Sequence, residues 1–230
     1  MNEKSSSEYY LSHKSEILEQ FNSHTQAWRP LLIKRYGDGF TNAVLSETRH
    51  QYEVLIPNIP YIGGDDNPMT RHLVRSTTSL TLYKVMKSRG KTALEVGKIV
   101  YDAVVASVSR LPLNLDYELS EEFIAQEKEQ ARKSQERRYS WDWVWEFVEG
   151  NGLEFDYGYD FLECATQKLY RAYNANDFLP FYCYLDFVTH RTAGWGFART
   201  KTLAEGFDRC DFRWKGGGET KKDWPPPFVQ

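Results

Sequence analysis

The first 138 residues repeat their apolar side chains with the period of α-helices. Steps of three, four or seven residues predict one long helix, or two joined pieces, through Tyr10, Ile17, Leu18, Phe21, Trp28 and Leu31. The same periodicity predicts helices over residues 41–53, 70–87, 92–108 and 121–137. Thr92 and Glu95 fit a capping box at the start of the helix over 92–108. We therefore expect this part of the chain to be helical.

From Tyr139 onward the hydrophobic period shortens to two residues, which is typical of β-strands. In WDWVWEFVEG the large aromatic residues occupy every second position. The run Gly150-Asn151-Gly152 then indicates a turn. LEFDYGYD repeats the alternation and places Leu153, Phe155, Tyr157 and Tyr159 on one face. The pattern predicts a β-hairpin.

The remaining residues predict two helices and two further strands. Residues 161–173 have helical spacing, and Asn176 and Asp177 suit the start of a helix that runs to about His190. A strand over FLPFYCYLDFV is the alternative, because this segment is rich in aromatic residues. FARTKTLA and CDFRWK alternate as strands do, whereas the tail KGGGETKKDWPPPFVQ is typical of a loop.

The expected fold class is α+β, in which a helical N-terminal layer packs on a C-terminal ββααββ antiparallel sheet unit. The helical region covers residues 1–138 and the α+β region covers residues 139–230. We expect one compact domain overall, because a chain of this length can bury a sizeable core.

Composition and charge narrow the classes of function. The 230 residues are 41% hydrophobic with a formal net charge of −3. Lysine and arginine are scattered among acidic residues, which argues against nucleic acid as the main partner. The N-terminus lacks the pattern of a signal peptide, and no apolar run approaches the roughly 20 residues of a membrane helix. We expect a soluble cytoplasmic protein that acts on a small molecule and contacts no membrane; a homo-oligomer stays open.

The three cysteines, Cys164, Cys183 and Cys210, all follow residue 163. Thiols near carboxylates and arginines serve in nucleophilic catalysis, metal binding or plain packing. A helix places Cys183, Asp186 and His190 along one edge, whereas a strand separates Cys183 from Asp186. The spacing selects no metal site and we expect no cofactor, although zinc held by the three cysteines and Asp186 or His190 stays chemically open.

Several segments together resemble the L-2-amino-thiazoline-4-carboxylic acid hydrolase family. They are GLEFDYGYDFLECATQKLY, FLPFYCYLDF and GWGFARTKTLAEGFDRCDFRWK, with IPYIGG and SQERRYSWDWVWEFVEG upstream. The resemblance extends from Pro57 to Pro225 and implies hydrolysis of 2-amino-Δ2-thiazoline-4-carboxylate to N-carbamoyl-L-cysteine. The expected activity is therefore the hydrolysis of a small cyclic amidine-like or isothiourea acid at a non-peptide carbon–nitrogen bond or ring.

The ββααββ order is also similar to small-ligand domains of the 4-vinyl reductase and haem nitric-oxide-binding type. That resemblance implies a sensor or binding domain without catalysis. Its ligand would lie against an aromatic face built from Trp143, Trp145, Phe155 and Tyr157.

As a hydrolase, the chain has Cys183 as its best candidate nucleophile and Asp186 as the base or the group that orients a water. Cys210 and Asp211 are further catalytic candidates. Because neighbours on a strand point to opposite faces, only one of that pair can enter a given pocket. Each candidate has a structural alternative, which is core packing for the thiols and an ion pair for Asp186.

The substrate carboxylate requires a cationic partner. Arg199 is the first candidate and Arg213 the second, because a guanidinium offers two parallel hydrogen bonds. Both arginines have the alternative of a solvated strand position. Thr200 and Cys164 complete the candidate substrate contacts. We expect one cluster in space to contain Cys183, Asp186, Arg199, Cys210, Asp211 and Arg213.

Overall fold

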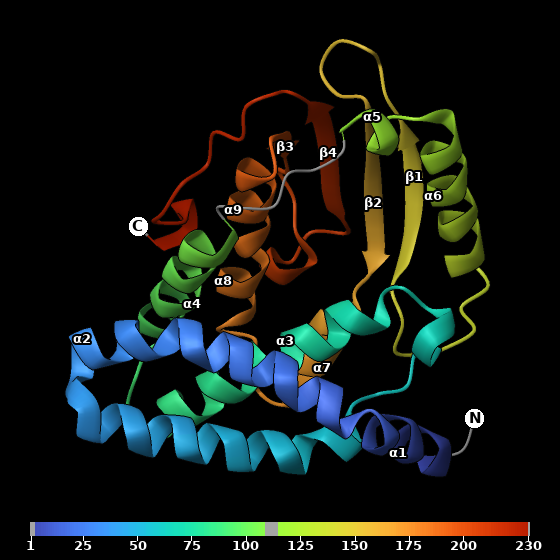
Figure 1. Cartoon of the computed structure of the whole chain (residues 1–230). Coiled ribbons are helices and arrows are strands. Elements are labelled where there is room, and N and C mark those ends of the chain that lie inside the picture. Colours follow the sequence, from blue (N-terminus) through green and yellow to red (C-terminus); the bar gives the residue numbers. More distant parts are fainter. Residues whose placement is uncertain (1–2, 109–114, 230) are drawn as a thin grey trace. The chain divides into compact units, whose positions relative to one another are not determined.

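The computed structural model describes residues 3–108 and 115–229 (Figure 1). Helices occupy the N-terminal part and strands the C-terminal part, which confirms the α+β class. The chain forms two compact units. The helical unit comprises Met1–Ala106 and Leu169–Tyr182, and the sheet unit comprises Ser107–Lys168 and Cys183–Gln230.

The helical unit is built around a long, folded-back helix. Its elements are α1 (Glu3–Ser12), α2 (Lys14–Leu55), η1 (Ile56–Asn58), η2 (Gly64–Asp66), α3 (Thr70–Lys87) and α4 (Ala93–Val108). The two helices predicted before residue 54 are confirmed as the two halves of α2, which meet at a kink at Gly37, whose φ of 80° suits glycine. Tyr10, expected on the first of them, lies on α1. Phe21 stacks on Tyr52 at 4.7 Å, so the two halves of α2 lie side by side.

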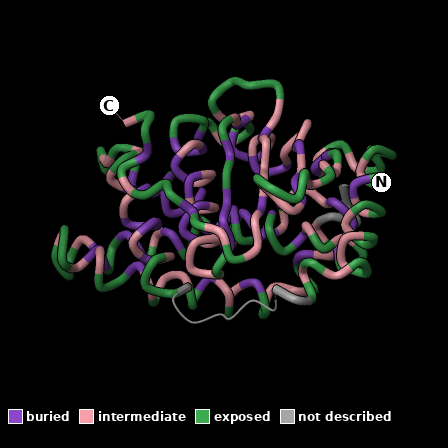
Figure 2. The backbone as a smooth tube through the Cα atoms, turned by 90° about the horizontal axis from the view of Figure 1, so that it is seen from above, coloured by how far each residue is buried: buried purple, intermediate pink, exposed green. Residues whose placement is uncertain are grey.

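The helix predicted over 70–87 is confirmed as α3, most of which is buried. Figure 2 shows how buried and exposed stretches alternate along the backbone. The capping box of α4 is also confirmed, because the Thr92 N–H donates to Glu95 and the Glu95 N–H donates to Thr92. The segment of residues 169–182 packs on α3. There Phe178 stacks on Tyr83 at 4.5 Å and the Tyr170 hydroxyl donates to the Ser76 carbonyl at 3.0 Å.

The sheet unit contains four antiparallel strands in the order β1-β2-β4-β3. The strands are β1 (Val144–Glu149), β2 (Tyr157–Glu163), β3 (Trp195–Ala198) and β4 (Cys210–Gly216). The other elements of the chain are α5 (Leu115–Glu118), α6 (Glu121–Ser134), α7 (Ala165–Ala172), α8 (Leu179–Cys183), α9 (Leu185–Thr192), η3 (Leu203–Glu205) and η4 (Pro227–Val229). Two strands, a helical stretch and two strands follow one another, which is the predicted order. The strand predicted over FARTKTLA is mostly wrong, because β3 ends at Ala198 and η3 begins at Leu203.

Several predicted boundaries are wrong, each for a local reason. The second hairpin strand begins at Tyr157 and not at Leu153, because the Asn151 side chain accepts the N–H groups of residues 153–155 and keeps them out of the sheet. That strand then continues to Glu163, so the helix expected from 161 begins only at Ala165. The helix expected from 176 to 190 is two short helices, α8 and α9, and the strand alternative for this segment is wrong.

Alternation along the strands gives the sheet two different faces. One face, which we call the aromatic face, carries Cys210 together with Trp145, Phe147, Tyr157, Tyr159, Phe161, Phe197, Phe212 and Trp214. Helix α9 packs on this face, where Phe187 lies 5.1 Å from Phe197. The opposite face carries Asp160, Asp211 and Arg213.

Side-chain groups occupy both edges of the sheet. At the β3 edge, the Thr220 hydroxyl accepts the Phe197 N–H at 2.8 Å and donates to the Trp195 carbonyl at 2.6 Å. At the β1 edge, the Ser134 hydroxyl accepts the Trp145 N–H at 3.0 Å and the Gln135 amide donates to the Trp145 carbonyl at 2.7 Å. These groups take the positions that a neighbouring strand would fill.

Candidate functional site

A buried arginine organises the candidate site in the sheet unit. Arg199 follows β3, and only 4% of its side chain is exposed. Its guanidinium donates to the Asp186 carboxylate at 2.5 Å and to the Cys183 carbonyl at 2.9 Å. The ring centres of Phe187 and Phe212 lie 5.2 Å and 5.0 Å from the guanidinium carbon of Arg199. Arg199 therefore fixes the end of α8 and the first turn of α9 relative to each other.

The three thiols gather around Asp186. Burial raises the pKa of Cys164, Cys183 and Cys210, and the charge of Asp186 lies close enough to raise each of them further. Cys183 and Cys164 are partly exposed, whereas Cys210 is buried. Among the sequence candidates, the structure thus brings Cys183, Asp186, Arg199, Cys210 and Cys164 together.

The thiols differ in their hydrogen bonds. The Cys164 sulfur accepts the Gln167 N–H at 3.5 Å, and the Cys210 sulfur accepts the Leu203 N–H at 3.2 Å. The Cys183 thiol makes no hydrogen bond to the described residues. Cys183 is therefore the partly exposed thiol that no backbone donor holds.

Asp186 combines accessibility with desolvation. Its side chain is 38% exposed. Burial nevertheless raises the pKa of Asp186 above its ordinary value, against the lowering effect of Arg199. The carboxylate is thus both accessible and partly desolvated. It can reach a ligand and binds a proton more strongly than an ordinary aspartate does.

The opposite face of the sheet holds the other three candidates. Asp211 accepts the N–H groups of Thr200 and Lys201 at 2.8 Å and 2.5 Å, and the Thr200 hydroxyl donates to the same carboxylate. Arg213 pairs with Asp160 at 2.8 Å. The structure places Asp211, Thr200 and Arg213 away from the thiols, because strand alternation separates Asp211 from Cys210.

His190 lies one turn after Asp186 on α9, where sequence reasoning considered it only as a zinc ligand. Its ring lies 4.4 Å from that of Phe197 and 5.5 Å from that of Trp214. Burial and the nearby Arg199 lower the pKa of His190 to about 4, so the ring is neutral at pH 7. A neutral imidazole can accept a proton or a hydrogen bond from a ligand.

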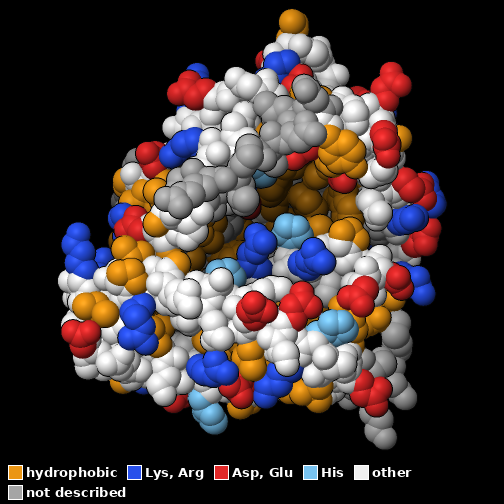
Figure 3. Space-filling model, viewed as in Figure 1, with side chains coloured by type: hydrophobic (Ala, Val, Ile, Leu, Met, Phe, Trp, Pro, Cys, Tyr) orange, Lys and Arg blue, Asp and Glu red, His pale blue; other side chains and the backbone are white. Residues whose placement is uncertain are grey.

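The aromatic face continues from the thiols between α9 and α6. Phe161, Tyr159 and Phe212 are half-buried there. Figure 3 shows hydrophobic side chains lying among charged ones on one side of the molecule. Cys183 and Asp186 therefore lie next to the extended aromatic face of the sheet.

The end of the aromatic face away from the thiols carries two carboxylates that the sequence analysis did not identify. Glu118 accepts the Trp195 indole N–H at 3.1 Å, and Glu127 accepts the Tyr159 hydroxyl. Both residues belong to short or highly charged helical segments that resemble solvated surface in sequence. Only the tertiary contacts reveal that they face aromatic side chains.

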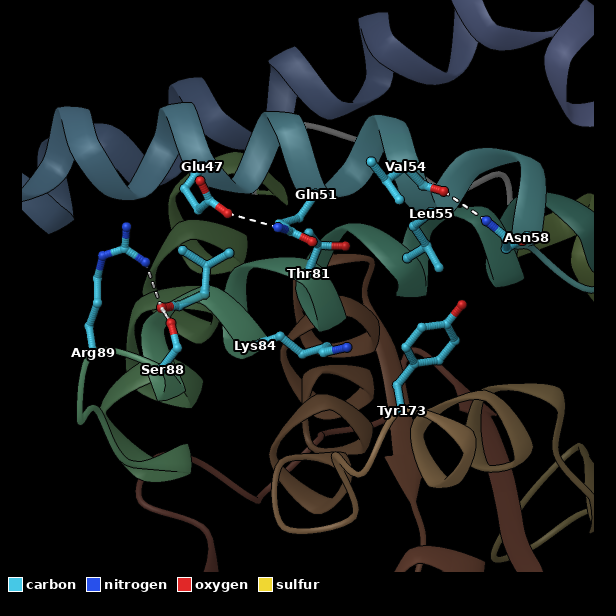
Figure 4. Close-up of a pocket in the computed structure, with 11 residues that line it drawn as sticks. Glu47, Gln51, Val54, Leu55, Asn58, Thr81, Lys84, Ser88, Arg89 and Tyr173 are labelled. Carbon is cyan, nitrogen blue, oxygen red and sulfur yellow. Dashed lines mark hydrogen bonds between the residues drawn. The ribbon is translucent and has the colours of Figure 1, made fainter.

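A separate cavity of about 410 Å³ lies in the helical unit (Figure 4). Helices α2 and α3 form it with Tyr173, and Lys84 lies 4.7 Å from the ring centre of Tyr173. Its carboxylate, Glu47, accepts a hydrogen bond from Gln51. The cavity contains none of the candidate nucleophiles.

Two further properties concern only the residues that the structure describes, 3–108 and 115–229. Within these ranges no three His, Cys, Asp or Glu side chains are placed to hold a metal ion. Likewise, none of the helices there has the length and apolar character required to cross a membrane.

Comparison with known proteins identifies one family. Residues 71–214 match the family model described as L-2-amino-thiazoline-4-carboxylic acid hydrolase. The matched range includes all candidate site residues described above. No curated protein and no solved structure matches the chain significantly.

Proposed function

Because the chain belongs to the L-2-amino-thiazoline-4-carboxylic acid hydrolase family, we propose that its sheet unit hydrolyses a small cyclic isothiourea acid of the 2-amino-thiazoline-4-carboxylate type. The observation that carries the proposal is that Cys183, a partly exposed residue, lies near the Asp186 carboxylate, whose side chain is 38% exposed.

The reacting carbon lies between two nitrogens and the ring sulfur. The Cys183 sulfur attacks this carbon, the ring C–S bond breaks, and the substrate sulfur leaves as a thiol. Water then attacks the same carbon and releases Cys183, so that one water is consumed and N-carbamoyl-L-cysteine forms. Both C–N bonds of that carbon survive in this product, so this scheme opens the ring at its C–S bond, which is the ring alternative of the expected activity and not the C–N one.

Asp186 supplies the proton transfers in this scheme. Burial raises the pKa of the Cys183 thiol well above its ordinary value, so the free site holds a neutral thiol. The attack therefore requires a base, and Asp186, with its raised pKa, accepts the proton. The same carboxyl then returns the proton to the leaving sulfur.

Arg199 has a different part in this proposal from the one its sequence suggests. Its guanidinium already donates to Asp186 and to the Cys183 carbonyl, and its side chain is almost fully buried. We therefore assign it the orientation of Asp186 and of the α8 end, in place of substrate binding.

The test uses purified protein and 2-amino-Δ2-thiazoline-4-carboxylate, with mass-spectrometric detection of N-carbamoylcysteine. Cys183→Ser and Asp186→Asn should each abolish turnover, while the matched variants Cys164→Ser and Cys210→Ser should retain it. Circular dichroism verifies the folding of all four variants. Turnover by Cys183→Ser near the wild-type rate would show that a carboxylate-activated water, and not this thiol, attacks.

The aromatic face supports a second candidate function, the binding of a small apolar ligand without chemistry. Half-buried rings on a sheet face can enclose such a ligand. In that case no ring opening would occur with any isothiourea acid, and an apolar ligand would still raise the melting temperature of both wild type and Cys183→Ser.

A further inference from the structure

The two carboxylates at the far end of the aromatic face lack a cationic partner. Neither Glu118 nor Glu127 forms an ion pair with the described residues, although their neighbour Asp156 pairs with Lys215 at 2.6 Å. Burial raises the pKa of Glu118, and the charge of Glu127 raises it further. The Tyr157 ring lies 5.8 Å from the rings of both Trp195 and Tyr159, whose side chains donate to these two carboxylates. Two neighbouring anions in partly desolvated surroundings attract a cation.

The hydroxyl of a largely buried tyrosine lies beside this carboxylate pair without a hydrogen-bond partner among the described residues. Tyr157 is only 4% exposed, and its hydroxyl makes no hydrogen bond to the described residues. The charges of Glu118 and Glu127 both act on it. The Tyr157 hydroxyl is not among the fully enclosed side-chain atoms of the described residues that lack a hydrogen bond, so it keeps some access to solvent. A polar group of this kind is free to hydrogen-bond to water or to a ligand.

The carboxylate pair and the thiols stand at opposite ends of the aromatic face. Tyr157 is paired with Trp214, and Phe161 is paired with Cys210. Four residues of strand separate the two positions, which corresponds to about 13 Å. The rings of Tyr159 and Phe212 lie between them. A five-membered ring acid bound at Cys183 cannot reach the carboxylates.

We propose that Glu118, Glu127 and Tyr157 bind a cationic group of the substrate, so that the natural substrate is an extended isothiourea whose cation lies about 13 Å from the carbon attacked. This inference rests on the proposed function for its reacting end. An ammonium or guanidinium loses its hydration on entering the site, and two carboxylates and the aromatic rings offset that loss. An apolar spacer would lie across Tyr159 and Phe212.

Binding of a simple cation tests the subsite without any turnover. Isothermal titration calorimetry would compare 4-phenylbutylammonium with the equally long 4-phenylbutanol. The ammonium should bind wild type at least about tenfold more tightly than the alcohol. Glu118→Gln and Glu127→Gln should each remove most of this preference, because an amide keeps the hydrogen bond to Trp195 or Tyr159 but not the charge.

The matched control is Glu146→Gln, an exposed position on the opposite face of the sheet, which should bind like wild type. Equal binding of the ammonium and the alcohol by wild type, or an unchanged preference in folded Gln variants, would overturn the proposal. Circular dichroism and thermal melting verify the fold of each variant.

A turnover measurement separates this inference from the proposed function. The 5-aminopentyl and pentyl amides of 2-amino-thiazoline-4-carboxylate differ only in a distal ammonium. Faster ring opening of the aminopentyl amide, lost in Glu118→Gln, supports the subsite. Equal rates for both amides in wild type and variants would reject the subsite and leave the hydrolase standing. An intact charge preference in binding without any ring opening would reject the hydrolase alone.

Discussion

Replacing Arg199 by methionine isolates the ion pair at the centre of the candidate site. Methionine fills similar space between Phe187 and Phe212 but cannot donate to Asp186 or to the Cys183 carbonyl. The variant therefore leaves a desolvated carboxylate without its counter-ion.

The expected loss of unfolding free energy follows from the surroundings of the pair. Removing one partner of a fully buried ion pair costs about 3 to 5 kcal/mol. Asp186 is 38% exposed, so solvent screens part of that cost. Lost contact with the aromatic rings adds about 1 kcal/mol. We expect a loss of about 3 kcal/mol at pH 7.

The loss should depend on pH with a defined sign. Arg199 lowers the pKa of Asp186, so its removal moves that already raised pKa further up in the folded state. A folded protein that binds the proton more tightly loses stability as pH rises through that pKa. The deficit of Arg199→Met should thus be smaller at pH 4.5 than at pH 7.5.

Urea unfolding at both pH values measures the effect, with Arg213→Met as the matched control. The partner of Arg213, Asp160, keeps a second arginine, Arg209, at 3.0 Å, so the control should lose only about 1 kcal/mol. The double variant Arg199→Met with Asp186→Asn should lose less unfolding free energy than the sum of the losses of its two single variants. Strictly additive losses, or a deficit no larger than that of the control, would refute the role of the pair.

Three further outcomes are expected. The pKa values of His24 and His190 are lowered to about 4, so the unfolded chain binds more protons below pH 6.5, and unfolding free energy should fall by about 2 kcal/mol per histidine between pH 7 and pH 5. A flat profile in urea titrations, or one unchanged by His24→Gln, would contradict this. Thr92→Ala should cost about 1 kcal/mol by removing the cap of α4, whereas the conservative Thr92→Ser should not. Gly158→Ala should cost about 1 to 3 kcal/mol, because the added carbon would lie 2.4 Å from the Phe212 carbonyl oxygen; an unchanged melting temperature would show that the strand pair yields freely.

Helices were easier to predict from the sequence than strand boundaries. The periodicity over 70–87 and the Thr92 cap are local signals, and both are confirmed. The start of β2 depends on how the Asn151 side chain accepts three backbone N–H groups, which the alternation of LEFDYGYD does not reveal. The sequence showed the turn propensity of Asn151, but not that its side chain would bind backbone N–H groups up to four residues away.

The candidate site was predictable where spacing alone decides proximity. Cys183 and Asp186 are three residues apart, and the helical interpretation placed them together. The ion pair between Arg199 and Asp186 follows only from tertiary packing, so the sequence did not show that Arg199 already has a partner. The carboxylates of Glu118 and Glu127 gave no signal, because a charged helix is equally compatible with a solvated surface.

The hydroxyl groups at the two sheet edges bear on self-association. An open edge recruits strands from other chains and can seed fibres or swapped dimers. Here Thr220 occupies the β3 edge, and Ser134 with Gln135 occupies the β1 edge. Growth of the sheet by strand addition would first have to expel these groups. Any solution dimer of this protein should therefore form through surfaces other than a continuous intermolecular sheet.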